Sequence, residues 1–132
     1  MKVALFTDGG FHDKRITGGY CILDENNEVL YEGTQEGKLG TNNEAEYLGL
    51  IIGLEKCVEI GATEVHVFMD SQLVVNQMSG AWRVKARHLR PLYLQAKAFS
   101  DIFDEISFGW VKRTHALIMK VDGLIRRTYE EQ

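Results

Sequence analysis

Two largely apolar segments of the sequence each lead into an aspartate. Asp8 follows the run Val3–Phe6, and Asp70 directly follows Val65–Met69. Short, nearly continuous apolar runs predict strands that are buried on both faces of a sheet. A carboxylate where such a strand leaves the core is costly to desolvate unless it is paired, hydrogen-bonded or bound to a cation. The two aspartates therefore predict two neighbouring strand ends directed at one site.

Two further acidic residues interrupt the apolar stripes of predicted helices. Glu46 shares a helix face with Leu50, Gly53, Leu54 and Cys57, and Asp122 lies within the stripe Ile118, Val121, Ile125 and Tyr129. Clustered carboxylate oxygens suit a hard divalent cation such as Mg²⁺ or Mn²⁺. Two such ions about 3.5–4 Å apart can hold the attacking and leaving oxygens of a phosphoryl displacement. The residue pattern is also compatible with purely structural roles, since Asp70 could cap the following helix and Asp8 could be an ordinary turn aspartate.

The elements that position these residues alternate as in a mixed α/β sheet. Strands are expected over residues 2–8, 20–23, 28–37, 64–69 and 106–111, and helices over 43–60, 70–79, 91–103 and within 117–129. The pair Gly9-Gly10 indicates a turn, followed by a polar loop to about Thr17. Short connections predict an antiparallel meander of the first three strands, and the later strand–helix alternation predicts parallel pairing beside it. We expect a five-stranded mixed sheet flanked by helices, in one domain over residues 1–132.

Helix boundaries carry clear local signals. Thr41 and Glu44 have the spacing of a capping box at the start of the long helix, and Gly61 follows its end. Gly80 ends the next helix, and Pro91 suits the first turn of the third. Because Glu44 has a capping role available, Glu46 is the acidic residue expected to face the sheet.

Composition and charge narrow the class of protein. The chain is 45% hydrophobic and 26% charged, which is typical of a globular domain. No apolar run approaches the about 20 residues that a membrane helix needs, and no signal-peptide pattern begins the chain, so we expect a cytoplasmic protein. Cys21 and Cys57 are expected to be reduced and buried.

The net charge of −4 argues mildly against a nucleic-acid binder, but basic residues cluster locally around Trp82. These are Arg83, Lys85, Arg87, His88 and Arg90. The segment could follow a nucleic-acid backbone, or it could be a solvated basic face with one core tryptophan.

Three motifs together resemble the ribonuclease H family, type 1 branch. They are Thr7-Asp8-Gly9-Gly10, Thr41-Asn42-Asn43-Glu44-Ala45-Glu46-Tyr47 and Met69-Asp70-Ser71-Gln72-Leu73-Val74, with Trp110-Val111-Lys112 and a late aspartate as a weaker fourth match. The resemblance covers nearly the whole chain and is closest to the compact archaeal-like form. It implies the ribonuclease H-like fold and hydrolysis of the RNA strand of an RNA–DNA hybrid, leaving a 5′-phosphate and a 3′-hydroxyl. The implied cofactor is Mg²⁺, with Mn²⁺ as a substitute.

The resemblance also implies roles for individual residues. Asp8, Glu46, Asp70 and Asp122 would hold two metal ions and act in catalysis, and His115 would assist product release. Gly9, Gly10, Thr41, Asn42, Asn43 and Gln72 would contact the hybrid. One departure concerns the last loop, where Ile118 stands at a position that is often Asn in the family. Glu130 and Glu131 are alternative donors if Asp122 is misplaced.

Two other functions remain open at this point. The chain could be a noncatalytic RNA–DNA hybrid-binding module that lost its chemistry through the altered last loop. It could also be a related metal nuclease that acts on double-stranded RNA or on DNA junctions. We expect a monomer in each case.

Overall fold

The computed structural model describes residues 1–130, so Glu131 lies outside the described residues. The strands are β1 (Lys2–His12), β2 (Arg15–Leu23), β3 (Val29–Leu39), β4 (Glu64–Met69) and β5 (Glu105–Trp110). The helices are α1 (Asn42–Glu59), α2 (Gln72–Met78), α3 (Arg90–Ser100) and α4 (Ala116–Glu130). The predicted order of three strands, helix, strand, two helices, strand and helix is confirmed.

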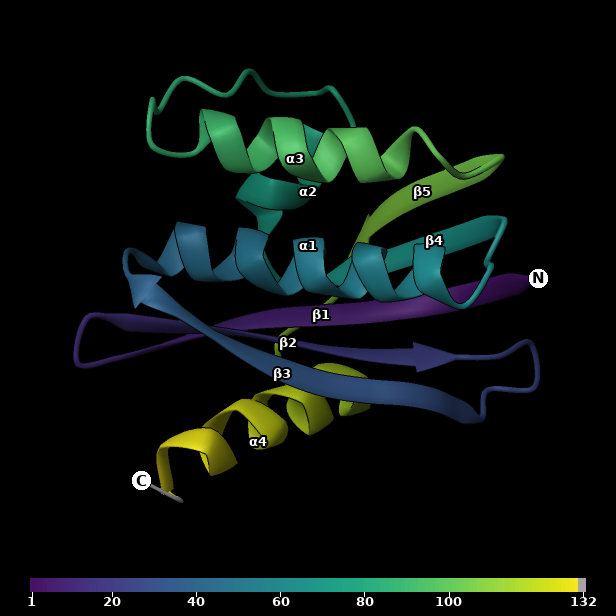
Figure 1. Ribbon diagram of the computed structural model, residues 1–132, viewed down its shortest axis with the longest axis horizontal. Coiled ribbons are helices and arrows are strands. Elements are labelled where there is room, and N and C mark those ends of the chain that lie inside the picture. The colour runs from purple at the N-terminus through teal and green to yellow at the C-terminus, as the bar shows by residue number, and fades with distance from the viewer. Residues whose placement is uncertain (131–132) are drawn as a thin grey trace.

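The strands form one mixed sheet in the order β3-β2-β1-β4-β5 (Figure 1). β1, β2 and β3 are antiparallel neighbours, and β4 and β5 run parallel to β1. Figure 1 shows α1, α2 and α3 on one side of the sheet and α4 alone on the other. The predicted five-stranded mixed sheet flanked by helices is confirmed.

The first hairpin differs from the prediction. β1 continues through Gly9-Gly10 to His12, and β2 begins at Arg15, so the polar loop expected over residues 9–17 is wrong. The turn lies instead at Asp13 and Lys14, which have φ of 50° and 65°. Two consecutive residues with positive φ fit the right-handed twist of a two-residue hairpin. The paired glycines serve packing, because a Cβ on Gly9 would meet α1 and one on Gly10 would meet α4.

Helix boundaries agree closely with the sequence signals. The Thr41 side chain accepts the Glu44 backbone N–H at 3.2 Å, and Glu44 accepts the Thr41 N–H at 3.0 Å, which completes the predicted capping box. Gly61 and Gly80 have φ of 81° and 85°, a conformation that favours glycine just beyond a helix end. α3 ends at Ser100, earlier than the predicted residue 103.

Two hydrophobic cores lie on the two faces of the sheet. The larger packs α1, α2 and α3 against the sheet around Leu5, Leu54 and Val67. The smaller lies under α4 and consists of Phe6, Cys21, Leu23, Ile118, Val121 and Ile125. Cys21 and Cys57 are buried and free, as predicted. Among residues 1–130, no helix is long and apolar enough to cross a membrane.

Candidate metal centre

The predicted strand ends meet where β1 and β4 separate. The parallel pairing of these strands runs from Lys2↔Glu64 to Phe6↔Phe68. Asp8 and Asp70 each lie two residues beyond the last pair, on the same face as Phe6 and Phe68. The Trp110 indole N–H donates to the Asp70 carbonyl oxygen at 3.0 Å, which ties this strand end to β5.

Glu46 reaches the two aspartates because α1 lies very close to β1. The Gly9 backbone N–H donates to Glu46 Oε1 at 3.1 Å. A Cβ on Gly9 would lie 2.3 Å from the Ala45 carbonyl carbon, and one on Gly49 would lie 2.2 Å from the Asp8 carbonyl oxygen. Carboxylate oxygens of Asp8, Glu46 and Asp70 consequently lie within 4.8 Å of one another. These three residues are the carboxylate cluster.

The carboxylate cluster is electrostatically unfavourable when all three groups are charged. Burial, followed by the charge of Asp70, raises the pKa of Asp8 to about 7, although hydrogen bonds from Glu46 and Gly9 partly oppose this. Burial, followed by the charges of Asp8 and Asp70, raises the pKa of Glu46 well above its ordinary value. Arg113 Nε lies 3.8 Å from Asp70, but the Arg113 side chain is 92% exposed and therefore neutralises little.

These residues fit a divalent cation. The cluster offers hard oxygen donors from three side chains, which are the ligands that Mg²⁺ and Mn²⁺ prefer. Glu46 Oε2 is buried and has no hydrogen-bond partner among the described residues. A buried, unpartnered carboxylate oxygen is costly, and a bound cation would satisfy it while relieving the mutual repulsion.

Asp122 lies in the same cleft but outside the carboxylate cluster. The cleft has a volume of about 470 Å³ and is lined by Asp8, Gly9, Glu46, Asp70, Arg113, Thr114, Ile118, Met119 and Asp122. The Asp122 side chain is 48% exposed and pairs with Arg126 at 3.0 Å. The sequence predicted four converging carboxylates, whereas the structure brings three together and places the fourth on the rim.

His115 does not line this cleft. Its ring stacks on Phe6 with centroids 5.1 Å apart, and its Nδ1 accepts the Leu117 backbone N–H at 3.1 Å. It therefore caps the start of α4 and faces a separate cavity. Arg113 and Thr114, its neighbours in the same loop, line the cleft instead. Neither residue was predicted, because a loop residue outside the three motifs has no spacing signal of its own.

The other predicted substrate contacts lie at the starts of α1 and α2 and along β1. Asn42, Asn43 and Gln72 are exposed at the first turns of α1 and α2, where a ligand can reach them. Thr41 is exposed but uses its hydroxyl as the helix cap. Gly9 lines the cleft.

Gly10 has a packing role that the sequence analysis did not foresee. A Cβ there would lie 2.4 Å from Ile125 Cγ2 and 2.8 Å from the Tyr129 hydroxyl. Its missing side chain therefore allows α4 to approach β1.

The basic segment after α2 forms an exposed surface. Trp82 is 49% exposed, so the alternative of a core tryptophan is wrong. Trp82, Arg83, Lys85 and Arg90 line a groove of about 580 Å³ together with Tyr93. An exposed indole among cations has the composition of a nucleic-acid contact surface.

Comparison with known proteins gives one consistent result. Residues 6–118 match the family described as reverse transcriptase-like. The chain is 46% identical over 116 residues to the bifunctional protein Rv2228c of Mycobacterium tuberculosis, of which it spans only 32%. The solved N-terminal RNase H domain of Rv2228c, a fusion with maltose-binding protein, superposes with a TM-score of 0.86 at 42% identity, covering 94% of this chain and 95% of that one.

Two further solved structures extend the similarity. RNase H1 of the halophilic archaeon Halobacterium salinarum covers 100% of both chains with a TM-score of 0.93 at 28% identity. LC11-RNase H1, solved in complex with an RNA/DNA hybrid, covers 97% of this chain and 99% of its own with a TM-score of 0.85 at 28% identity. Fold, motif order and sequence identity agree, and this chain belongs to the ribonuclease H family, with a type 1-like form.

Proposed function

We propose that this chain hydrolyses the RNA strand of RNA–DNA hybrids at the carboxylate cluster, with divalent cations as cofactors. The observation that carries the proposal is the convergence of Asp8, Glu46 and Asp70 within 4.8 Å on one side of an open cleft. The family relationship supports the substrate class, because the related LC11-RNase H1 was solved with an RNA/DNA hybrid. The chain spans about a third of Rv2228c, so the activity proposed is that of this chain alone.

In this proposal the carboxylates bind the cations, and polar residues at the helix starts bind the hybrid. Asp8 lies on the central strand between Glu46 and Asp70, so it is the residue best placed to share two ions, and Asp122 would contribute from the rim. Bound Mg²⁺ would supply an activated water and stabilise the charge that develops on the phosphate. Asn42, Asn43 and Gln72 would contact the minor groove, where 2′-hydroxyls distinguish RNA from DNA.

Gel-resolved cleavage of an end-labelled hybrid tests the activity. We expect the RNA strand alone to be cut with Mg²⁺ or Mn²⁺ and no cutting with chelator, while matched duplex RNA and duplex DNA stay intact. Asp70→Asn should lower turnover by at least about 100-fold, since a metal ligand contributes several kcal/mol to the transition state. Asp104→Asn, at an exposed aspartate in the turn before β5, is the matched control and should retain full turnover. Full activity in Asp70→Asn would refute the metal assignment.

A second function is favoured by the position of Asp122. Its pairing with Arg126, outside the carboxylate cluster, fits a module that binds hybrids without cutting them. A noncatalytic binding module would bind the hybrid without metal-dependent cleavage. Cutting of duplex RNA in the same panel, or of a DNA junction added to it, would instead identify a related nuclease on this fold.

A further inference from the structure

A second and larger cavity opens on the side of the sheet that carries α4. It has a volume of about 760 Å³, within the range of small-molecule sites. Its lining comes from the first half of β1, from β4, from the turn between β2 and β3, and from the start of α4. Among the described residues, no lining residue is shared with the carboxylate cleft. We call it the rear cavity.

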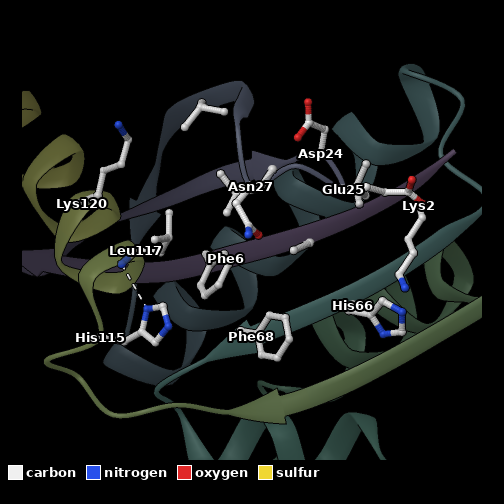
Figure 2. A pocket seen from close by; sticks show the side chains of 14 residues that line it. Lys2, Phe6, Asp24, Glu25, Asn27, His66, Phe68, His115, Leu117 and Lys120 are labelled. Atoms are coloured by element: carbon white, nitrogen blue, oxygen red, sulfur yellow. Dashed lines mark hydrogen bonds between the residues drawn. The ribbon is translucent and has the colours of Figure 1, made fainter.

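Four aromatic rings line the rear cavity, those of Phe6, His66, Phe68 and His115, and three of them lie stacked side by side (Figure 2). The rings of Phe6 and Phe68 stack with centroids 5.1 Å apart and an interplanar angle of 25°, and those of Phe6 and His115 with 5.1 Å and 28°. Phe68 and His115 are only half-buried, so ring surface remains accessible. Planar heterocycles stack on such rings, and a stacked base contributes about 1–3 kcal/mol. The aromatic group therefore favours a flat, aromatic occupant.

Two polar side chains beside these rings, Asn27 and His115, can form hydrogen bonds with the polar edge of a stacked heterocycle. Figure 2 shows the Asn27 amide directed toward Phe6. Asn27 is held in a turn, with φ of 63° and its backbone N–H donating to the Asp24 carbonyl at 3.0 Å. His115 Nδ1 accepts the Leu117 N–H, so in the neutral imidazole Nε2 carries the proton and can donate. An amide that both donates and accepts, beside an N–H donor, matches the hydrogen-bonding edge of a nucleobase.

The charged side chains around the rear cavity disfavour binding of a phosphate group. Lys2 pairs with Glu64 at 3.5 Å, and Lys120 pairs with Glu32 at 3.3 Å. Asp24 and Glu25 also line the cavity. Both lining lysines are therefore already paired, and two carboxylates would repel an anion. A neutral ligand fits better than a nucleotide.

We propose that the rear cavity is a binding site for a neutral nucleoside, with its base stacked on the accessible rings of Phe68 and His115, which buried Phe6 supports, and its edge hydrogen-bonded to Asn27. The site is separate from the carboxylate cluster and needs no divalent cation. Its existence is therefore independent of the nuclease activity proposed above.

Titration of the ¹⁵N-labelled chain with adenosine, in the presence of chelator, tests this site by NMR. We expect saturable shifts of the Asn27 side-chain amide and of the His115 and Phe68 backbone signals at adenosine concentrations up to about 1 mM. Guanosine and uridine test other bases, and ribose tests the sugar alone. AMP should bind no more tightly than adenosine, because the cavity offers no unpaired lysine.

Two variants with matched controls locate the site. Asn27→Gly keeps the left-handed turn but removes the amide, and Phe68→Leu removes a ring but keeps an apolar side chain. Each should weaken adenosine binding by about tenfold. Asn26→Gly in the same turn and Phe108→Leu, which packs against the larger core, should bind adenosine as the parent does. Thermal melts would verify that each variant is folded.

Several outcomes would overturn the proposal. Absence of saturable shifts with all three nucleosides would do so, as would binding that both test variants retain. Concentration-dependent dimerisation that Phe68→Leu abolishes, without nucleoside binding, would assign the cavity to a second copy of the chain. Shifts confined to Asp8, Glu46 and Asp70 would place the nucleoside in the carboxylate cleft instead.

Discussion

Two carboxyl groups of the carboxylate cluster hold protons at a pH where free carboxyl groups have lost them. Burial raises the pKa of both Asp8 and Glu46, and that of Asp8 reaches about 7. The metal-free folded state therefore binds more protons than the unfolded chain between about pH 4 and pH 7. Its stability must fall as the pH rises through this window, because each raised pKa favours the folded state only at the acidic end.

Denaturation with chelator present gives a direct test of this linkage. We expect the free energy of unfolding of the metal-free protein to decrease by at least about 1 kcal/mol between about pH 5 and pH 8. Asp8→Asn should flatten this dependence, since it removes one of the two groups and the repulsion on the other. Saturating Mg²⁺ should stabilise the protein most at the alkaline end, because the cation binds the ionised form. Equal pH slopes for the parent and Asp8→Asn would contradict this account.

At the scale of elements, the position of Glu46 depends on how closely α1 approaches β1. Gly49→Ala places a Cβ 2.2 Å from the Asp8 carbonyl oxygen, so helix and strand must separate. We expect a loss of about 1–3 kcal/mol of stability and, in the protein that remains folded, weaker Mg²⁺ binding because Glu46 moves from Asp8. Urea unfolding and metal titration measure the two effects.

A glycine in α4 supplies the control for that substitution. A Cβ on Gly123 would meet nothing within 4 Å. Gly123→Ala should therefore stabilise the protein by up to about 1 kcal/mol through helix propensity alone. If Gly49→Ala were as harmless as Gly123→Ala, close packing would not be what positions Glu46.

The elements also show where sequence reasoning succeeds and where it stops. Local signals were sufficient for α1, since Thr41, Glu44 and Gly61 specify its ends through nearby backbone groups. They failed at Gly9-Gly10, because glycine gives the same signal for a turn and for close packing against a distant helix. The true turn, at Asp13 and Lys14, contains no glycine to indicate it.

The same limit applies to the candidate site. The apolar runs before Asp8 and Asp70 predicted two converging strand ends, and the helix face predicted Glu46. The position of Asp122 depends instead on how α4 packs across the sheet, and its partner Arg126 lies on that same helix. The role of His115 could not be assigned from the sequence, because a histidine at this position in the loop could equally cap α4 or act in catalysis.

For the molecule as a whole, the candidate metal centre lies between helices that pack in cores of unequal size. α1 packs in the larger core, whereas α4 covers the other face through a small core around Ile118, Val121 and Ile125. Because α4 packs in the smaller core, it should open more readily than α1. A cation bound by the carboxylate cluster and by Asp122 would connect α4 to the sheet.

Amide hydrogen exchange with and without Mg²⁺ tests this connection. If Asp122 is a ligand, opening of α4 must release part of the bound metal, so exchange in α4 should slow by up to about 100-fold when Mg²⁺ is at about 100 times its dissociation constant. Asp122→Asn should remove this added protection from α4 while the amides around Asp8 and Glu46 still respond to Mg²⁺. Equal exchange of α4 in both conditions, beside clear protection of β1, would show that the cluster binds metal without Asp122.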